Sequence, residues 1–65
     1  MCLSDVYLVK PNHEKELICR KIASVKKEDK NVVLTDILGV ATVVEAEVDS
    51  VDLMENYVYL RGESR

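Results

Sequence analysis

Short runs of strand-favouring residues, separated by polar turns, make up almost the whole chain. The runs cover residues 2–9, 16–26, 32–38, 40–51 and 57–61. The fourth run alternates most clearly, with Val44, Ala46 and Val48 on one face and carboxylates on the other. A period of two is typical of a half-buried strand. In the last run we expect Val58 and Leu60 to point inward, which leaves tyrosines at a rim or an interface.

The second run, residues 16–26, fits two kinds of structure. As a helix capped by Asn12, it groups three apolar residues near helical spacing: Ile18, Ile22 and Val25. As a strand with Lys21 as the exception, it aligns four residues on one face: Leu17, Cys19, Ala23 and Val25. Periodicity alone leaves residues 13–26 open between strand and helix.

The breaks between the runs favour an all-β fold. Pro11 cannot donate to a strand ladder, so it ends the first strand or starts the turn. Gly39 interrupts the pattern and permits a bend or a bulge. We therefore predict a small antiparallel β-barrel or rolled sheet of about five to six short strands.

The length of 65 residues predicts one domain, spanning residues 1–65. A domain of this size buries only ~60% of its unfolded surface. Two cysteines allow at most one disulfide bond. We therefore expect a homodimer, because pairing adds buried apolar area. No apolar run is long enough to span a membrane and no signal-peptide pattern opens the chain, so the cytoplasm is the expected location.

Composition argues against two classes of function, nucleic-acid binding and catalysis. The net charge is −3, Phe and Trp are absent, and no basic stripe is evident, which argues against nucleic-acid binding. The single histidine, His13, lies in a polar turn, and neither a CxxC pair nor a glycine-rich phosphate loop is present. The carboxylates fall at solvent-facing positions and in turns. We therefore do not expect an enzyme.

The two cysteines have different contexts. Cys19 lies between apolar neighbours, where a free thiol behaves as a small core hydrophobe. Cys2 follows the initiator Met, and removal of that Met would place a free α-amine beside its thiolate. This pair can chelate a metal, and soft thiolate with nitrogen suits Ni(II) or Cu(II). Two copies meeting at a two-fold axis could supply an N₂S₂ set. Alternatively, Cys2 merely begins a strand.

Four short segments resemble the CooT family of very small proteins. They are residues 1–9 (MCLSDVYLV), 33–39 (VLTDILG), 48–53 (VDSVDL) and 58–60 (VYL). The resemblance covers nearly the whole chain. It implies a β-rich homodimer that binds Ni(II) and assists nickel insertion into carbon monoxide dehydrogenase, with Cys2 as the metal ligand. It also implies that the second run is a strand.

Alternative functions remain open at this point. Many members of the same family carry the label of predicted RNA-binding proteins, a label based on fold analogy. The Met-Cys-Leu opening also resembles HypC-type hydrogenase maturation chaperones, although the Pro-Gly segment expected of that family is absent. A third alternative is a metal-independent protein that docks on an enzyme through an apolar rim.

Overall fold

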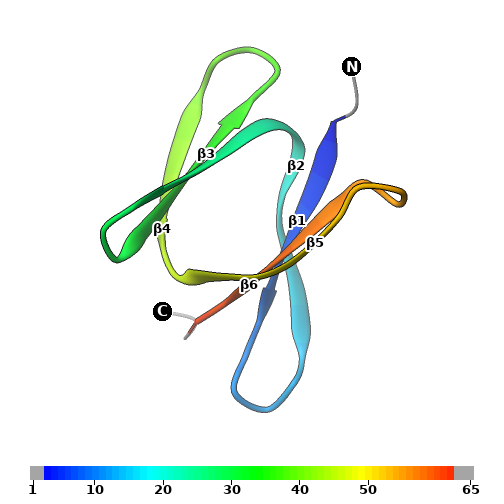
Figure 1. The fold of residues 1–65 in the computed structure, drawn as a ribbon, viewed down its shortest axis with the longest axis vertical. Coiled ribbons are helices and arrows are strands. Elements are labelled where there is room, and N and C mark those ends of the chain that lie inside the picture. The colour runs from blue at the N-terminus through cyan, green and yellow to red at the C-terminus, as the bar shows by residue number, and fades with distance from the viewer. Residues whose placement is uncertain (1–2, 63–65) are drawn as a thin grey trace.

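The computed structural model describes residues 3–62, and within them the fold is all-β, as predicted (Figure 1). Six strands form one sheet in the order β4-β3-β2-β1-β6-β5. Their bounds are β1 (Ser4–Val9), β2 (Lys15–Glu28), β3 (Asn31–Asp36), β4 (Ala41–Glu45), β5 (Glu47–Asp52) and β6 (Tyr57–Arg61). This part of the chain contains no helix that could cross a membrane.

The second run is a strand, and a bulge divides it. The first part of β2 pairs with β1 and the last part pairs with β3, so that Ile22 lies opposite both Ser4 and Asp36. Lys21 adopts a left-handed φ of 55°, and the register with β1 shifts beside it. Bulges of this kind bend a strand and increase its twist. The bend lets β2 belong to both halves of the rolled sheet.

Irregular pairing along β2 explains where its predicted face is wrong. Simple alternation placed Leu17 and Ala23 inside, but Leu17 is 45% exposed and Ala23 is also exposed. The register with β1 shifts between Leu17 and Cys19, which leaves Leu17 opposite Tyr7 on the outer face. A second shift beside Lys21 makes Ile22 the buried member of the strand at 4% exposure, and Ala23 lies at the shift in pairing with β3.

The predicted barrel alternative is wrong, because the sheet rolls up without closing. The edge strands β4 and β5 do not pair with each other within the described residues. A single residue, Ala46, links them, which is too short for a hairpin turn, so the chain passes from one edge of the sheet to the other. The sheet is mostly antiparallel, as expected, but β1 and β6 pair in parallel, with Tyr7 opposite Tyr59.

The core fills the inside of the roll. It consists of eight buried side chains, none of them polar: Val6, Leu8, Ile22, Val32, Leu34, Ala46, Val58 and Leu60. The inward orientation predicted for Val58 and Leu60 is confirmed. The single strand predicted for residues 40–51 is wrong: Ala46, which is buried, separates β4 from β5, and these two strands lie at opposite edges of the sheet. The outer face of β1 and β6 is left uncovered by any other element of residues 3–62.

Candidate functional site

The start of β1 lies between the tips of two hairpins (Figure 1). On one side Ser4 pairs with Ile22, which pairs in turn with Asp36 at the end of β3. On the other side the Asp5 backbone N–H donates to the Asn56 carbonyl over 3.1 Å. The tips at residues 37–40 and 53–56 therefore flank the point where the chain enters the sheet.

The side chain of Asp36 shapes the first tip. Its Oδ1 accepts hydrogen bonds from the backbone N–H groups of Leu38 and Val40, each over 2.9 Å. The Gly39 N–H donates to the Asp36 carbonyl over 3.0 Å. Gly39 has a φ of 87°, which a residue without a Cβ adopts at no steric cost. These contacts account for the Asp and the Gly in the segment at residues 33–39.

Asp52 shapes the second tip in the same way. Its Oδ1 accepts from the N–H groups of Met54 and Glu55 over 3.0 and 2.8 Å. Asn56 then takes a left-handed φ of 60°, a conformation that Asn tolerates well. Aspartate side chains that bond to backbone two residues ahead are a standard way of fixing turns. Both tips are therefore ordered by their own hydrogen bonds.

Both tips present apolar side chains to solvent. The exposed fractions are 85% for Leu38, 81% for Leu53 and 91% for Met54, and Ile37 is 57% exposed. Large exposed apolar groups gathered together mark interaction sites on soluble domains. A shallow hollow of about 230 Å³ lies between the start of β1 and the second tip, lined by Ser4, Ile22, Ala23, Ser24, Val25, Val51, Leu53, Asn56 and Val58. We call Ser4 and the tips at 37–40 and 53–56 the N-terminal end.

The predicted metal ligand, Cys2, lies outside the described residues, so the structure does not test it. Cys19 is described. It is partly exposed, carries a free thiol and packs against the core. Burial raises its pKa above the ordinary value, an effect that a Thr42 hydrogen bond opposes and the nearby Asp36 charge reinforces. A raised pKa disfavours the thiolate, which is the form that binds metals. Cys19 thus fits the predicted structural role better than a role as ligand.

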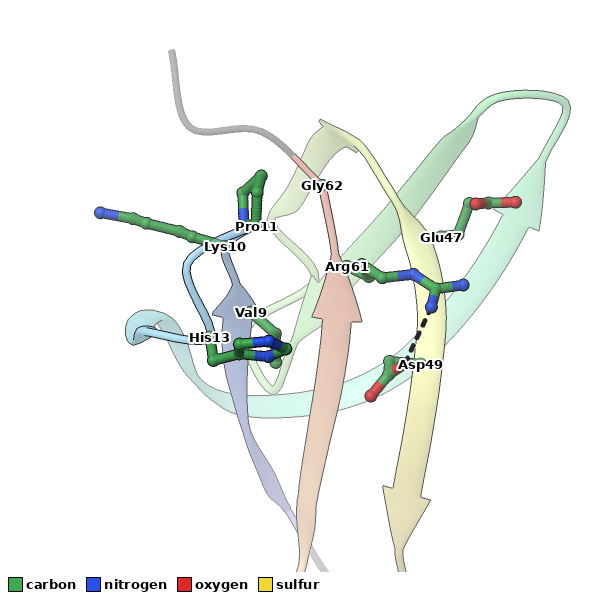
Figure 2. Close-up of a pocket in the computed structure, with 8 residues that line it drawn as sticks. All are labelled: Val9, Lys10, Pro11, His13, Glu47, Asp49, Arg61 and Gly62. Carbon is green, nitrogen blue, oxygen red and sulfur yellow. Dashed lines mark ion pairs between the residues drawn. The ribbon is translucent and has the colours of Figure 1, made fainter.

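Residues 3–62 contain no group of three His, Cys, Asp or Glu side chains placed to hold a metal ion. His13 has a left-handed φ of 69° and lines a different hollow, of about 470 Å³ (Figure 2). There Arg61 pairs with Asp49 over 3.7 Å. That hollow lies beside Val9, whereas the N-terminal end lies beside Ser4, so they sit at opposite ends of β1.

The sequence reasoning missed the two apolar tips. A signal for them was present, because an Asp at the end of a strand run is followed twice by two large apolar residues: Asp36-Ile37-Leu38 and Asp52-Leu53-Met54. Apolar residues next to a predicted strand read as part of that strand, and only the hydrogen bonds of the two Asp side chains place them in turns.

Comparison with known proteins places these features in context. The family model described as CO dehydrogenase accessory protein CooT matches residues 1–61. The fold is also similar to a crystal structure assigned as CooT from Carboxydothermus hydrogenoformans, with a TM-score of 0.83 and 19% sequence identity. That match covers 97% of this chain and 100% of the other. At this identity the likeness shows a shared fold. No curated protein matches the sequence.

Proposed function

The chain belongs to the CooT family of CO dehydrogenase accessory proteins, and from this premise we propose that it binds Ni(II) through Cys2 and assists nickel insertion into carbon monoxide dehydrogenase. Nickel is the cargo of this activity rather than a resident cofactor. The observation that carries the proposal is the family match, which begins at residue 1 and so includes the Met-Cys-Leu opening.

The chemistry of the first two residues supports a nickel site. Once Met1 is removed, Cys2 offers a thiolate and an α-amine that close a five-membered chelate ring. The amine has an ordinary pKa near 8, so a metal can displace its proton at neutral pH. A soft sulfur with a nitrogen donor selects Ni(II) over hard cations such as Mg²⁺.

The surroundings support a site shared between two copies. Cys2 precedes Ser4 by two residues, and two residues reach at most about 7 Å. Among the carboxylates at the N-terminal end, Asp5 pairs with Arg20 over 4.0 Å, and Asp36 and Asp52 each accept two backbone hydrogen bonds. The described residues therefore offer little to complete a site built on one Cys2. A second copy in a homodimer would supply another thiolate and amine, giving four donors.

The apolar tips support delivery to a protein partner. An accessory protein must bring its metal against the client, and ordered apolar groups beside the metal ligand would give the client a surface to bind. Leu38, Leu53 and Met54 fit this role because they contribute nothing to the core of their own chain. We place this activity in the cytoplasm, as expected from the sequence, with no catalytic role for the protein itself.

A nickel titration tests the proposal. Ni(II) added to the mature protein should give thiolate-to-nickel charge-transfer absorption and tight binding by calorimetry. Cys2→Ser should abolish both, whereas Cys19→Ser should keep both. A version with extra N-terminal residues, which blocks the α-amine, should bind more weakly with the thiolate intact. Unchanged nickel affinity in Cys2→Ser would refute the proposal.

A further inference from the structure

The open sheet has two edge strands, β4 and β5, and they differ in how they meet solvent (Figure 1). β5 carries three carboxylates in six residues, and its register with β6 shifts between Val48 and Ser50. Charges and bulges of this kind keep other strands away from a sheet edge. β4 has neither kind of protection along its length. It pairs with β3 over five consecutive residues without a shift, and its one charged residue, Glu45, is its last.

The segment that contains β4 is also the longest uncharged stretch of the chain. It runs from Ile37 to Val44 and contains no proline. Every residue from Ile37 to Val43 is exposed. Uncharged, strand-favouring segments that are exposed at a sheet edge pair readily with other strands. Because such exposure invites aggregation, its presence in the folded protein indicates a binding surface.

The main-chain groups of β4 point alternately toward β3 and toward the open edge. The Asp36 N–H donates to the Val40 carbonyl over 3.0 Å, and the antiparallel ladder of β3 and β4 continues from this pair. In such a ladder every second residue bonds to the neighbouring strand. Thr42 is therefore the next residue to bond to β3. Ala41 and Val43, on either side of it, direct their N–H and C=O groups away from the described part of the sheet.

We propose that the open edge of β4 binds an extended segment of a partner protein, which joins the sheet as a further strand. The N–H and C=O groups of Ala41 and Val43 are the main-chain donors and acceptors for this segment. In strand addition, main-chain hydrogen bonds give affinity and alternate side chains give specificity. The inference goes beyond the nickel proposal, because the edge acts whether or not Cys2 binds a metal.

The surroundings of β4 determine the chemistry of the partner segment. Thr42 and Val43 are both exposed and lie on opposite faces of the strand, because they are adjacent. A strand added beside them covers both, so β-branched side chains on each face fit best. From Asn31 to Leu60 the chain has six carboxylates and no Lys, Arg or His. Charge complementarity therefore favours a segment that is uncharged in the middle and has Lys or Arg at its ends.

The length of the edge predicts reversible binding. Five residues of strand span about 17 Å. A contact of this length buries much less than the ~800 Å² per partner that stable complexes bury. We therefore expect a dissociation constant on the order of 10–100 µM, which suits a contact that forms and releases.

A synthetic peptide tests the edge directly. The peptide has a lysine at each end and valine alternating with threonine between them, in the order Val-Thr-Val-Thr-Val, and both threonines are N-methylated. Methylation on alternate residues blocks one edge of the peptide, which prevents it from stacking into sheets and leaves the other edge for β4. In the matched control all residues between the lysines are N-methylated. The control keeps the same charge and the same side chains, but both of its edges are blocked.

Amide hydrogen exchange of the full chain, followed by NMR, locates the contact. With the peptide at about ten times its dissociation constant, the amides of Ala41 and Val43 should exchange about tenfold more slowly. Val51, on the other edge strand, is the reference and should not change. The control peptide should leave the exchange of all three amides unchanged.

Two substitutions at one position separate the main chain from the side chain. Val43→Pro removes one outward N–H and should weaken peptide binding about tenfold, which corresponds to the loss of about one hydrogen bond. Proline is tolerated on edge strands where the missing N–H would face solvent. Val43→Ser keeps the N–H and should bind within about threefold of wild type. Should Val43→Pro fail to fold in a thermal melt, the two peptides still decide the question on the wild-type protein.

Four results would overturn the inference. They are unchanged exchange at Ala41 and Val43 up to about 1 mM peptide, equal binding of the control peptide, protection of β5 in place of β4, and association of the protein with itself that Val43→Pro abolishes. The last would assign the edge to a second copy of the chain. Cys2→Ser separates this inference from the nickel proposal, because that variant should bind the peptide as wild type does even when nickel binding is lost.

Discussion

Asp36 and Asp52 are structural equivalents at the ends of β3 and β5. Each is the last residue of its strand, and each uses Oδ1 to accept two backbone hydrogen bonds from the tip that follows. The two tips lie on either side of the start of β1. The same hydrogen-bonding pattern, formed once by Asp36 and once by Asp52, therefore orders the two apolar tips beside the start of β1.

Removing either aspartate should loosen its tip and lower stability. We expect Asp36→Ala and Asp52→Ala each to reduce the free energy of unfolding by about 1–2 kcal/mol, since two backbone N–H groups lose their acceptor. Asp36→Asn keeps an oxygen at the same position and should lose less. Chemical denaturation measures both effects. Asp49→Ala, which breaks only the exposed pair with Arg61, is the control and should change stability by under about 0.5 kcal/mol.

The bulge in β2 makes a prediction opposite to that of simple strand patterning. By alternation Lys21 is a polar residue out of place, so valine should improve the strand. Its φ of 55° argues the reverse, because a β-branched residue is strained there. We expect Lys21→Val to destabilise the fold by about 1–3 kcal/mol and Lys21→Gly to be near neutral. Thermal unfolding compares the two, and a stabilised valine variant would contradict the bulge.

The pairing of β2 also shows how much of the fold could be predicted from the sequence. Alternation predicted the inward Val58 and Leu60, because a residue's face depends on local spacing, but it left residues 13–26 open between strand and helix. It misplaced Leu17 and Ala23, because the pairing of β2 shifts register between Leu17 and Cys19, between Cys19 and Ile22, and again at Ala23, and each shift breaks the alternation. The parallel pairing of β1 with β6 could not be predicted from local spacing either, since it joins segments from opposite ends of the chain.

Part of the candidate site could be predicted from the sequence and part could not. Cys2 could be singled out from its position after Met1 and from the family resemblance, both of which are properties of sequence. The ring contacts of Tyr7 with Tyr57 and Tyr59, and the placement of the two tips beside β1, depend on residues far apart in the chain. Nothing in the local pattern around Tyr7 predicts that its ring lies 5.6 Å from that of Tyr59.

Alkaline pH should weaken the fold through two groups. Burial raises the pKa of Cys19 above its ordinary value of 9.0, and hydrogen bonding with Tyr59 raises the pKa of Tyr57 above 10.0. A folded-state pKa above the unfolded one adds stability that is complete below the unfolded value and is lost as the pH rises through the folded value. Stability should therefore decline above about pH 9.

Substitution separates these two groups from the general alkaline effect. Cys19→Ala should flatten the part of the decline that begins near pH 9, and Tyr57→Phe the part that begins near pH 10. Denaturation midpoints measured from pH 7 to 11 give the comparison. An identical slope in all three proteins would mean that neither group is linked to folding.

The apolar tips should matter for the client and not for the fold. Leu53 and Met54 are 81% and 91% exposed, so replacing both with serine removes almost no buried surface. We expect Leu53→Ser with Met54→Ser to unfold within about 0.5 kcal/mol of wild type and to bind Ni(II) with unchanged affinity. Activation of nickel-free carbon monoxide dehydrogenase by the loaded protein should nevertheless fall severalfold, because the client loses its contact surface beside the metal.

Val43→Ser, at an exposed position on β4 away from the N-terminal end, controls for lost surface hydrophobicity and should activate normally. Full activation by the double variant would show that the client binds elsewhere, and would leave the exposure of these side chains without a functional reason.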